Sequence, residues 1–311
     1  MNKTIEQRIN TYGSYLKRKY GRRIFRVGLS INRECPHRLQ TGGCSFCLPD
    51  TYTDNSLDNQ TDPYKQLEQL IPKIKIGCGD VGLLAYFHHN TSTAGETEDL
   101  KQIFSQALKH SKIAGLIIST RPDYLNDEIV AMLSKLKGEV FLEIGLQSIH
   151  QKSLDLLNRG HTLQDFAQAM ELCKEYGIDS GVHLIPGIPG ETLSDMLATI
   201  AYLNDLPQVS QIKFHNLVVY RGTKLASEPE ALLREIPGLT PYLALLATLL
   251  QHTRGDKVIS RFFTSNVRRT NVSLNSFPGY KHNWLNKLTG YLNEHDIYQG
   301  SATPLPYKAI N

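Results

Sequence analysis

The sequence predicts an α/β protein whose body is a partial (βα)6 barrel, followed by a small C-terminal α/β extension. Short runs rich in branched apolar residues alternate with longer stretches whose apolar residues recur at helical spacing. This alternation is typical of a parallel sheet covered by helices. The 311 residues suffice for one barrel-like domain, and neither an internal repeat nor a low-complexity segment interrupts the alternation.

Six apolar runs between turn signals are expected to be the strands of this barrel. They are residues 24–31, 81–87, 114–119, 139–146, 178–185 and 210–219. Helices are expected between them, at residues 62–75, 96–110, 126–136 and 162–177 and from residue 190 onward.

Capping residues indicate where these helices begin and end. Asp62 precedes Pro63, and an acidic cap followed by proline at the first helical position is typical of a helix start. Asn126 and Thr162 are expected to cap two later helices in the same way, and Gly177 is expected to end the second of them.

The barrel is expected to span residues 23–220, with residues 1–22 as an N-terminal arm or helix and residues 221–311 as the extension. Within the extension, a helix is expected from Thr240, a strand at 258–263 and a last helix at 284–294, which together are too small to fold alone. The basic end of the arm is interpreted either as a solvated helix on the barrel or as a nucleic-acid contact.

Composition is that of an ordinary globular protein, with 41% hydrophobic and 21% charged residues. The net charge of +4 is mildly basic and compatible with a polyanionic partner. No run of 18 apolar residues and no signal peptide stand out, so a cytoplasmic protein without a membrane partner is expected. No obligate protein partner is evident.

Cysteines are the first chemical signal. Cys35, Cys44 and Cys47 lie within thirteen residues at the end of the first expected strand. Three thiolates leave one iron of an iron–sulfur cluster open, whereas structural zinc requires four ligands and would recruit His37. Cys173 is expected in the core. The last of the five cysteines, Cys78, is either a loop thiol or a further ligand.

This cysteine loop resembles that of the radical S-adenosylmethionine (SAM) superfamily, and Phe46 before the last cysteine fits the motif. A first gap of eight residues, instead of the commonest three, is typical of the elongator-catalytic-subunit-like branch. Segments 142–148, 158–162 and 182–192 resemble motifs of that branch. A narrower similarity to the YhcC/YtqA-like bacterial family extends through residues 85–87, 119–123, 219–225 and 298–300, with departures at His88 and Val218.

The resemblance implies an enzyme in which the three cysteines bind a 4Fe-4S cluster whose open iron chelates SAM. It further implies reductive cleavage of SAM to a 5′-deoxyadenosyl radical, with electrons from an external reductant.

SAM-binding residues follow from the same resemblance. Arg159 is expected at the methionine carboxylate and Gln147 as a second polar contact. Phe46 is expected on adenine, and Gly187 where the backbone approaches it. Glu143 is expected to line the barrel with a partner such as a ribose hydroxyl or an Arg, because an unpaired buried carboxylate is costly.

The substrate side is less defined, and no catalytic residue is assigned. Candidates near the fifth and sixth strands are His183, Lys213, His215, Tyr220 and Arg221. The resemblance implies tRNA as substrate, modified at the wobble uridine side chain. Arg261, Arg268, Arg269 and Lys281 are candidate phosphate contacts. Two alternatives are a radical SAM enzyme acting on a small molecule and a non-catalytic zinc protein.

Overall fold

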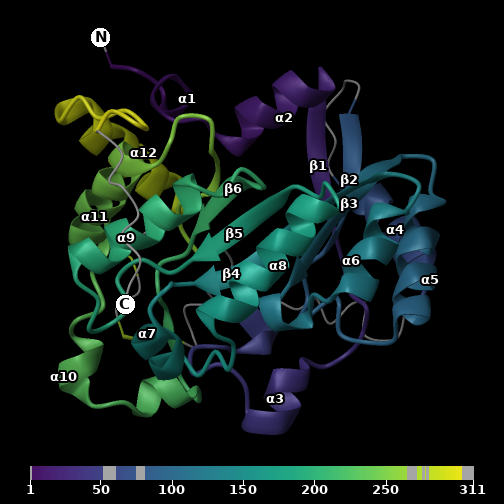
Figure 1. Ribbon diagram of the computed structural model, residues 1–311. Coiled ribbons are helices and arrows are strands. Elements are labelled where there is room, and N and C mark those ends of the chain that lie inside the picture. The colour runs from purple at the N-terminus through teal and green to yellow at the C-terminus, as the bar shows by residue number, and fades with distance from the viewer. Residues whose placement is uncertain are drawn as a thin grey trace.

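The main sheet has seven parallel strands. The computed structural model describes residues 2–51, 61–74, 81–264, 272–274, 277 and 280–302. The strand order is β1-β2-β3-β4-β5-β6-β8, which makes an incomplete barrel with β1 and β8 at its edges (Figure 1). The strands are β1 (Arg23–Leu29), β2 (Val81–Phe87), β3 (Ile113–Thr120), β4 (Glu139–Gln147), β5 (Ser180–Leu184), β6 (Val209–Phe214) and β8 (Val258–Arg261).

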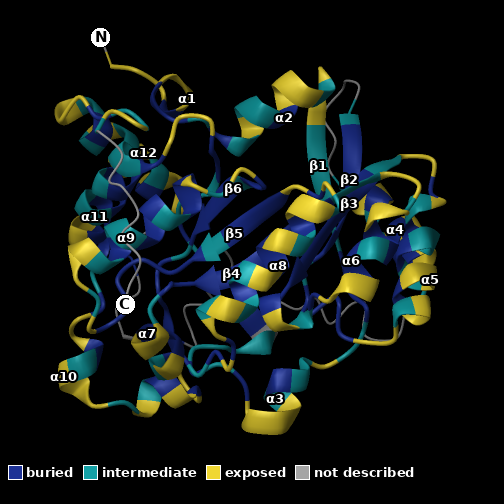
Figure 2. Cartoon of the chain, in the orientation of Figure 1, coloured by how far each residue is buried: buried dark blue, intermediate teal, exposed yellow. Residues whose placement is uncertain are grey.

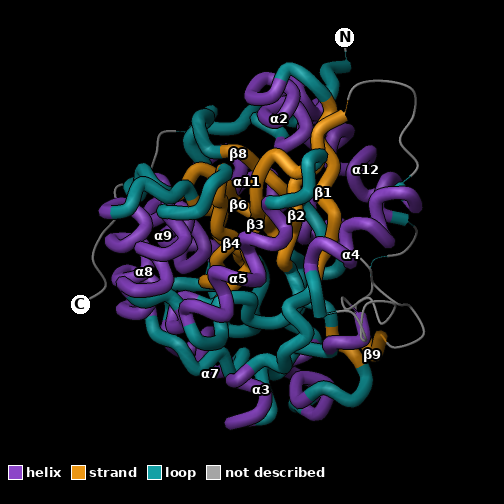
Figure 3. Tube along the Cα trace, turned by 90° about the vertical axis from the view of Figure 1, so that its right-hand side faces the viewer, coloured by secondary structure: helices purple, strands orange, loops and turns teal. Residues whose placement is uncertain are grey.

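Helices connect these strands, because parallel neighbours need a crossover. The connecting helices are α4 (Pro63–Leu70), α5 (Thr97–Leu108), α6 (Asp127–Ser134), α8 (Leu163–Glu175), α9 (Leu193–Asn204) and α11 (Leu239–His252). They enclose the strands (Figure 3) and turn buried faces inward and exposed faces outward (Figure 2). Asn126 and Thr162 cap α6 and α8 through their side chains, as predicted.

Two elements differ from the prediction at the C-terminal side of the barrel. The sixth strand ends at Phe214 and not near 219, and Val219–Tyr220 forms β7, which pairs antiparallel with β9 (Val272–Leu274). At the break, Asn216 Oδ1 accepts a hydrogen bond from the Thr264 amide, and the Asn216 carbonyl accepts one from the hydroxyl of Thr264. The apolar run 210–219 gives no sign that its last residues leave the main sheet and pair with β9.

Strand β8 is the second difference. The sequence placed residues 258–263 in an extension packed on a six-stranded barrel, but β8 pairs in parallel with β6 and is the seventh strand of the sheet. Helix α11 begins at Leu239 with Gly238 as its cap, and not at Thr240. The apolar face of a strand does not reveal which edge it joins, which is why the strand was predicted but its place in the main sheet was not.

The N-terminal arm is tied to the C-terminal region. It contains α1 (Ile5–Arg8) and α2 (Tyr12–Tyr20), and the last helix is α12 (Lys281–Glu294). The buried Arg8 guanidinium donates to the carbonyl of Ile297 at 2.9 Å, and the Ile259 amide of β8 donates to the carbonyl of Asn10. The arm therefore packs on the barrel at the amino ends of the strands, opposite α3 (Pro36–Thr41) (Figures 1 and 3).

The core lies between the sheet and the surrounding helices. Its largest fully buried side chains include Phe87, Phe104 and Phe166. Cys173 is 0% exposed in the same cluster, which confirms its expected place. Among the helices that the structure describes, none is long and apolar enough to cross a membrane.

Candidate active site

A cavity of about 310 Å³ lies inside the barrel at the carboxyl ends of the strands. Residues from or just after every strand of the sheet line it, as expected for a parallel α/β fold. It brings together twelve of the predicted site residues: Cys35, Cys44, Phe46, Cys47, Glu143, Gln147, Arg159, His183, Lys213, His215, Tyr220 and Arg261. Cys78, Arg268 and Arg269 lie outside the described residues.

The loop after β1 holds the three cysteines. Cys35 caps α3, Pro36 occupies its first turn, and Gly42 and Gly43 leave it with φ of 81° and 84°. These positive φ values favour glycine, which explains the pair before Cys44. The long first gap of the cysteine motif thus forms a short helix that returns the chain to the cavity.

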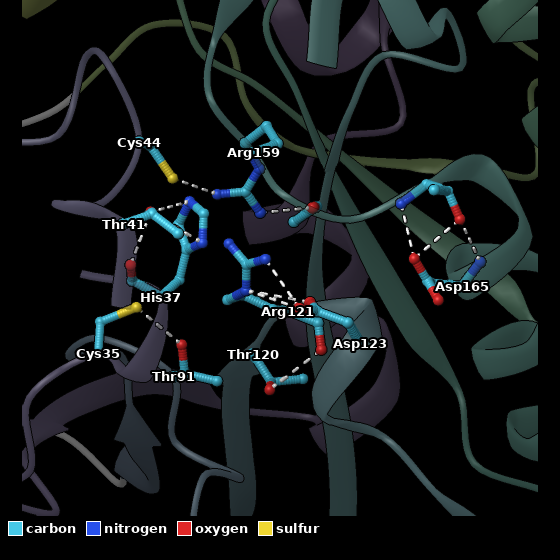
Figure 4. A network of polar contacts seen from close by, with 12 residues as sticks. Cys35, His37, Thr41, Cys44, Thr91, Thr120, Arg121, Asp123, Arg159 and Asp165 are labelled. Atoms are coloured by element: carbon cyan, nitrogen blue, oxygen red, sulfur yellow. Dashed lines mark hydrogen bonds and ion pairs between the residues drawn. The ribbon is translucent and has the colours of Figure 1, made fainter. Parts of the chain in front are cut away.

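Cys44 has a thiol whose pKa is lowered by nearby positive charge. Its Sγ accepts a hydrogen bond from Arg159 Nη1 at 3.0 Å (Figure 4). Burial opposes ionisation of the thiol, but the charge of Arg159, a hydrogen bond from His37 and the charge of Arg121 outweigh it and lower the pKa of Cys44 to about 6. A thiol that ionises this readily is suited to bind metal.

The other two cysteines contact different groups. Cys35 Sγ lies 3.3 Å from Thr91 Oγ1, and Arg38 Nη2 donates to Cys47 Sγ at 3.4 Å and to its carbonyl at 3.0 Å. In the described part of the chain, no three side chains of His, Cys, Asp or Glu meet as a single-ion site requires. In an iron–sulfur cluster each thiolate binds its own iron, so such convergence is not needed.

His37 is held by the protein itself. Its Nε2 donates to the carbonyl of Asn158 at 2.6 Å. The ring also fills the space beside Gly160, where an added Cβ would come within 2.5 Å of His37 Cε1. The Nε2 atom is therefore committed to the backbone; the zinc alternative is disfavoured by the lack of a three-ligand cluster among the described residues.

Arg159 and Arg121 present buried donors to the cavity. Arg159 Nη2 donates to the carbonyl of Gly145 at 2.9 Å, and Arg121 binds Asp123 through Nε and Nη2. Arg159 Nε and Arg121 Nη1 are buried and find no partner among the residues that the structure describes. Two orphaned guanidinium donors beside the cysteines fit an anionic ligand such as a carboxylate.

Arg159 was predicted from its turn motif, whereas Arg121 was not among the predicted site residues. Its position directly after β3 was the available signal, because residues that follow parallel strands share one edge of the sheet. Gly145 supports the arrangement, since a Cβ there would lie 3.0 Å from both Arg159 Nη2 and Gln147 Nε2. Gln147 itself has a φ of 73° where β4 ends.

A buried polar cluster occupies the inner part of the cavity. Glu143 Oε2 accepts hydrogen bonds from Lys213 at 2.6 Å, Tyr86 at 2.5 Å, His183 at 3.1 Å and Ser119 at 3.2 Å. The nearest charged partner of the carboxylate is therefore Lys213, which was not expected, and Arg26, with Nη1 3.5 Å from Glu143 Oε1, is an Arg partner as predicted.

Glu143 is ionised in this setting. Burial opposes its charge, but Lys213, a hydrogen bond from His183 and the charge of Arg26 hold the pKa of Glu143 well below its usual value. Burial lowers the pKa of Lys213 to about 7, against the attraction of Glu143 and with the repulsion of Arg261.

Of the remaining predicted residues, three lie at the cavity and Gly187 does not. The rings of His183 and His215 lie 5.2 Å apart, and Tyr220 is buried beside the same space. Gly187 does not line the cavity among its described residues; its φ of 82° places it where a Cβ would lie 2.6 Å from Pro237 Cγ. A side chain at this position would therefore clash with Pro237.

Comparisons with known proteins agree with this geometry. The family model of the radical SAM superfamily matches residues 29–203, more than half of the chain. The chain belongs to the radical SAM superfamily. Protein YhcC of Escherichia coli strain K12 is 30% identical over 97% of this chain and 98% of its own length, which confirms the narrower resemblance.

Two further likenesses concern the elongator-like branch of the radical SAM proteins. A tRNA uridine(34) acetyltransferase of Methanocaldococcus infernus is 28% identical over 62% of this chain and 42% of its own length. The solved structure of the archaeal M. infernus Elp3 superposes with a TM-score of 0.69 at 19% identity, covering 89% of this chain and 64% of that one. The latter confirms the fold of a partial barrel.

Membership of the radical SAM superfamily establishes the class of enzyme and its cofactors. The protein is a radical SAM enzyme whose cofactors are a 4Fe-4S cluster and SAM. The donor set described above fits both cofactors, because three thiols and two orphaned guanidinium donors lie around one cavity.

Proposed function

We propose that this radical SAM enzyme modifies the side chain of the wobble uridine in tRNA. The observation that carries the proposal is the similarity to the tRNA uridine(34) acetyltransferase, joined to a cavity that opens among the cysteines at the carboxyl ends of the strands. Arg261, predicted as a phosphate contact, lines this cavity.

We assign the cofactor contacts to residues around the cavity. Cys35, Cys44 and Cys47 hold the cluster, and Arg159 with Arg121 binds the carboxylate of SAM through the donors that have no protein partner in the described chain. When bound, the cluster and SAM supply one-electron chemistry that removes a hydrogen atom from an unactivated carbon.

The chain's own residues orient and shield these groups. Arg38 and Arg159 donate to the thiolates of Cys47 and Cys44, which stabilises their negative charge. Phe46 lines the cavity from the same loop and packs against the apolar cluster that contains Ile185, in keeping with a role beside adenine.

Gly145→Ala tests the assignment of Arg159. The new Cβ lies 3.0 Å from Arg159 Nη2 and displaces it, so SAM is expected to bind about tenfold more weakly, equivalent to about 1.4 kcal/mol. Equilibrium dialysis of SAM against the anaerobic, reconstituted enzyme measures this change. Gly290→Ala, which adds a Cβ with no atom within 4 Å, is the matched control and leaves the affinity unchanged. Equal SAM affinity in the wild type and both variants would contradict the assignment.

The tRNA proposal is tested by mass spectrometry of tRNA nucleosides from a deletion strain. One modified uridine is expected to disappear with accumulation of a precursor, and both return on complementation with the wild type but not with Cys44→Ala. Binding of undermodified tRNA is expected to fall steeply with salt. Unchanged nucleosides together with no gel shift would contradict the tRNA role and favour a small-molecule substrate.

A further inference from the structure

The inner wall of the cavity on the β6–β8 side carries an excess of positive charge. Lys213 of β6 and Arg261 of β8 are register partners in the parallel pairing of these strands, and both line the cavity. Arg26 of β1 approaches the same carboxylate, with Nη1 3.5 Å from Glu143 Oε1. Lys213 and Arg26 thus pair with Glu143, while Arg261 adds a further basic group beside them that has no carboxylate of its own in the described chain.

This imbalance has an energetic cost. Buried charges are expensive unless each is paired and hydrogen-bonded. Glu143 is already used by Lys213, Tyr86, His183 and Ser119. One carboxylate cannot neutralise the whole cluster: burial lowers the pKa of Arg261, and the opposing effects of Tyr86 and Glu143 do not fully offset it.

Two donors facing this space lack partners. Among the residues that the structure describes, neither a hydrogen bond nor an ion pair reaches the guanidinium of Arg261. His215 Nε2 is buried and likewise has no partner there. Burial, with Arg261 and His183 nearby, holds the pKa of His215 well below its usual value, so the ring is neutral and can donate one hydrogen bond.

We propose that Arg261 and His215, backed by Lys213, form a subsite that binds a carboxylate of the substrate. The inference rests on the proposed function in that this carboxylate belongs to the molecule on which the radical chemistry acts. A guanidinium fork suits the two oxygens of a carboxylate, and one such group removes one unit of excess charge. A phosphate dianion would bring a third oxygen and a second negative charge. The donors of Arg261 and His215 are then too few to bind all of its oxygens.

The subsite shares one cavity with the cysteine loop. Arg261 is the last residue of β8, at one edge of the sheet, and the cysteines lie in the loop after β1, at the other edge. Both line the same cavity. A substrate anchored by its carboxylate at Arg261 would extend toward the cofactor side. The wall formed by β6 and β8 would then select which substrate carbon reaches the radical.

Small probes test the subsite without turnover. Thermal unfolding of the reconstituted enzyme with saturating SAM is followed as chloride is replaced by acetate at constant ionic strength, with acetamide and inorganic phosphate in parallel. Acetate is expected to raise the melting temperature of the wild type saturably, by about 2–4 °C. Acetamide and phosphate are expected to have no saturable effect.

Arg261→Gln is expected to abolish the acetate effect. Arg254→Gln, which removes an exposed arginine paired with Asp256, is the control and keeps it. Without acetate, Arg261→Gln is expected to melt at or above the wild-type temperature, because the lost charge had no partner. A structural role would instead lower it.

Three results would overturn the subsite: an equal acetate effect in Arg261→Gln, a saturable effect of phosphate but not acetate, or a large loss of stability in Arg261→Gln without ligand. Because no tRNA is present, these outcomes are separate from the nucleoside analysis. Loss of the tRNA role with a retained acetate effect would refute the proposed substrate but not the subsite.

Discussion

Cys44→Ala is expected to abolish reductive cleavage of SAM, by at least about a hundredfold, while the barrel stays folded. The Sγ of Cys44 receives the hydrogen bond from Arg159 and has the lowered pKa of a metal-binding thiolate. Without it only two thiolates remain for the cluster. Iron content after anaerobic reconstitution, bleaching of the visible band by dithionite and formation of 5′-deoxyadenosine measure the loss.

Cys173→Ala is the matched control for this change. Cys173 is fully buried in the core, and burial raises the pKa of its thiol to about 12. This variant is expected to keep about four irons per chain and to cleave SAM. Retention of iron and cleavage in Cys44→Ala would remove Cys44 from the set of cluster ligands.

Glu143→Gln is expected to lower the free energy of unfolding by about 3–5 kcal/mol. The change removes the one negative charge that Lys213 and Arg26 share, and it leaves the buried charge of Lys213 and the partly buried charge of Arg26 without compensation. Urea unfolding measures the loss. Glu139→Gln, on the same strand but in a partly exposed pair with Lys19, is expected to cost at most about 1 kcal/mol.

The effect of Glu143 depends on pH with a defined sign. Because its pKa is lower in the folded than in the unfolded chain, its stabilisation is fully present above the unfolded value of 4.5 and is lost as the pH falls through the folded value. The gap between wild type and Glu143→Gln should therefore shrink in acid. Similar unfolding free energies for both variants at neutral pH would contradict the account of the cluster.

A double variant measures the interaction between Glu143 and Lys213 apart from their other contacts. Removing the charge of Lys213 together with that of Glu143 is expected to restore part of the lost stability, because the two groups interact directly at 2.6 Å.

Local signals were sufficient to predict most of the barrel. The strand predicted at 81–87 is β2 as observed, and the caps at Asn126 and Thr162 mark the starts of α6 and α8. Failures occurred where an element's partner is distant in sequence. The run 210–219 divides between two sheets, and β8 joins β6 through pairing that apolar periodicity does not encode.

In the site, too, residues with a local sequence signal were predicted, whereas contacts that depend on strand pairing were not. The cysteines could be found because their spacing is short, and Arg159 because it lies in a recognisable turn. Arg121 beside Cys44 and Arg261 beside Lys213 depend on strand order and register, which place residues far apart in sequence together. The cofactor contact expected at Gly187 stays a prediction, since the glycine packs against Pro237 and does not line the cavity among its described residues.

The central claim is tested most directly by supplying the reconstituted enzyme with SAM, a reductant and tRNA isolated from the deletion strain. The account predicts 5′-deoxyadenosine together with a mass change in one uridine nucleoside, both absent with Cys44→Ala. Formation of 5′-deoxyadenosine without any change in the tRNA nucleosides would contradict the proposed substrate, and absence of both products would contradict the assigned cofactor site.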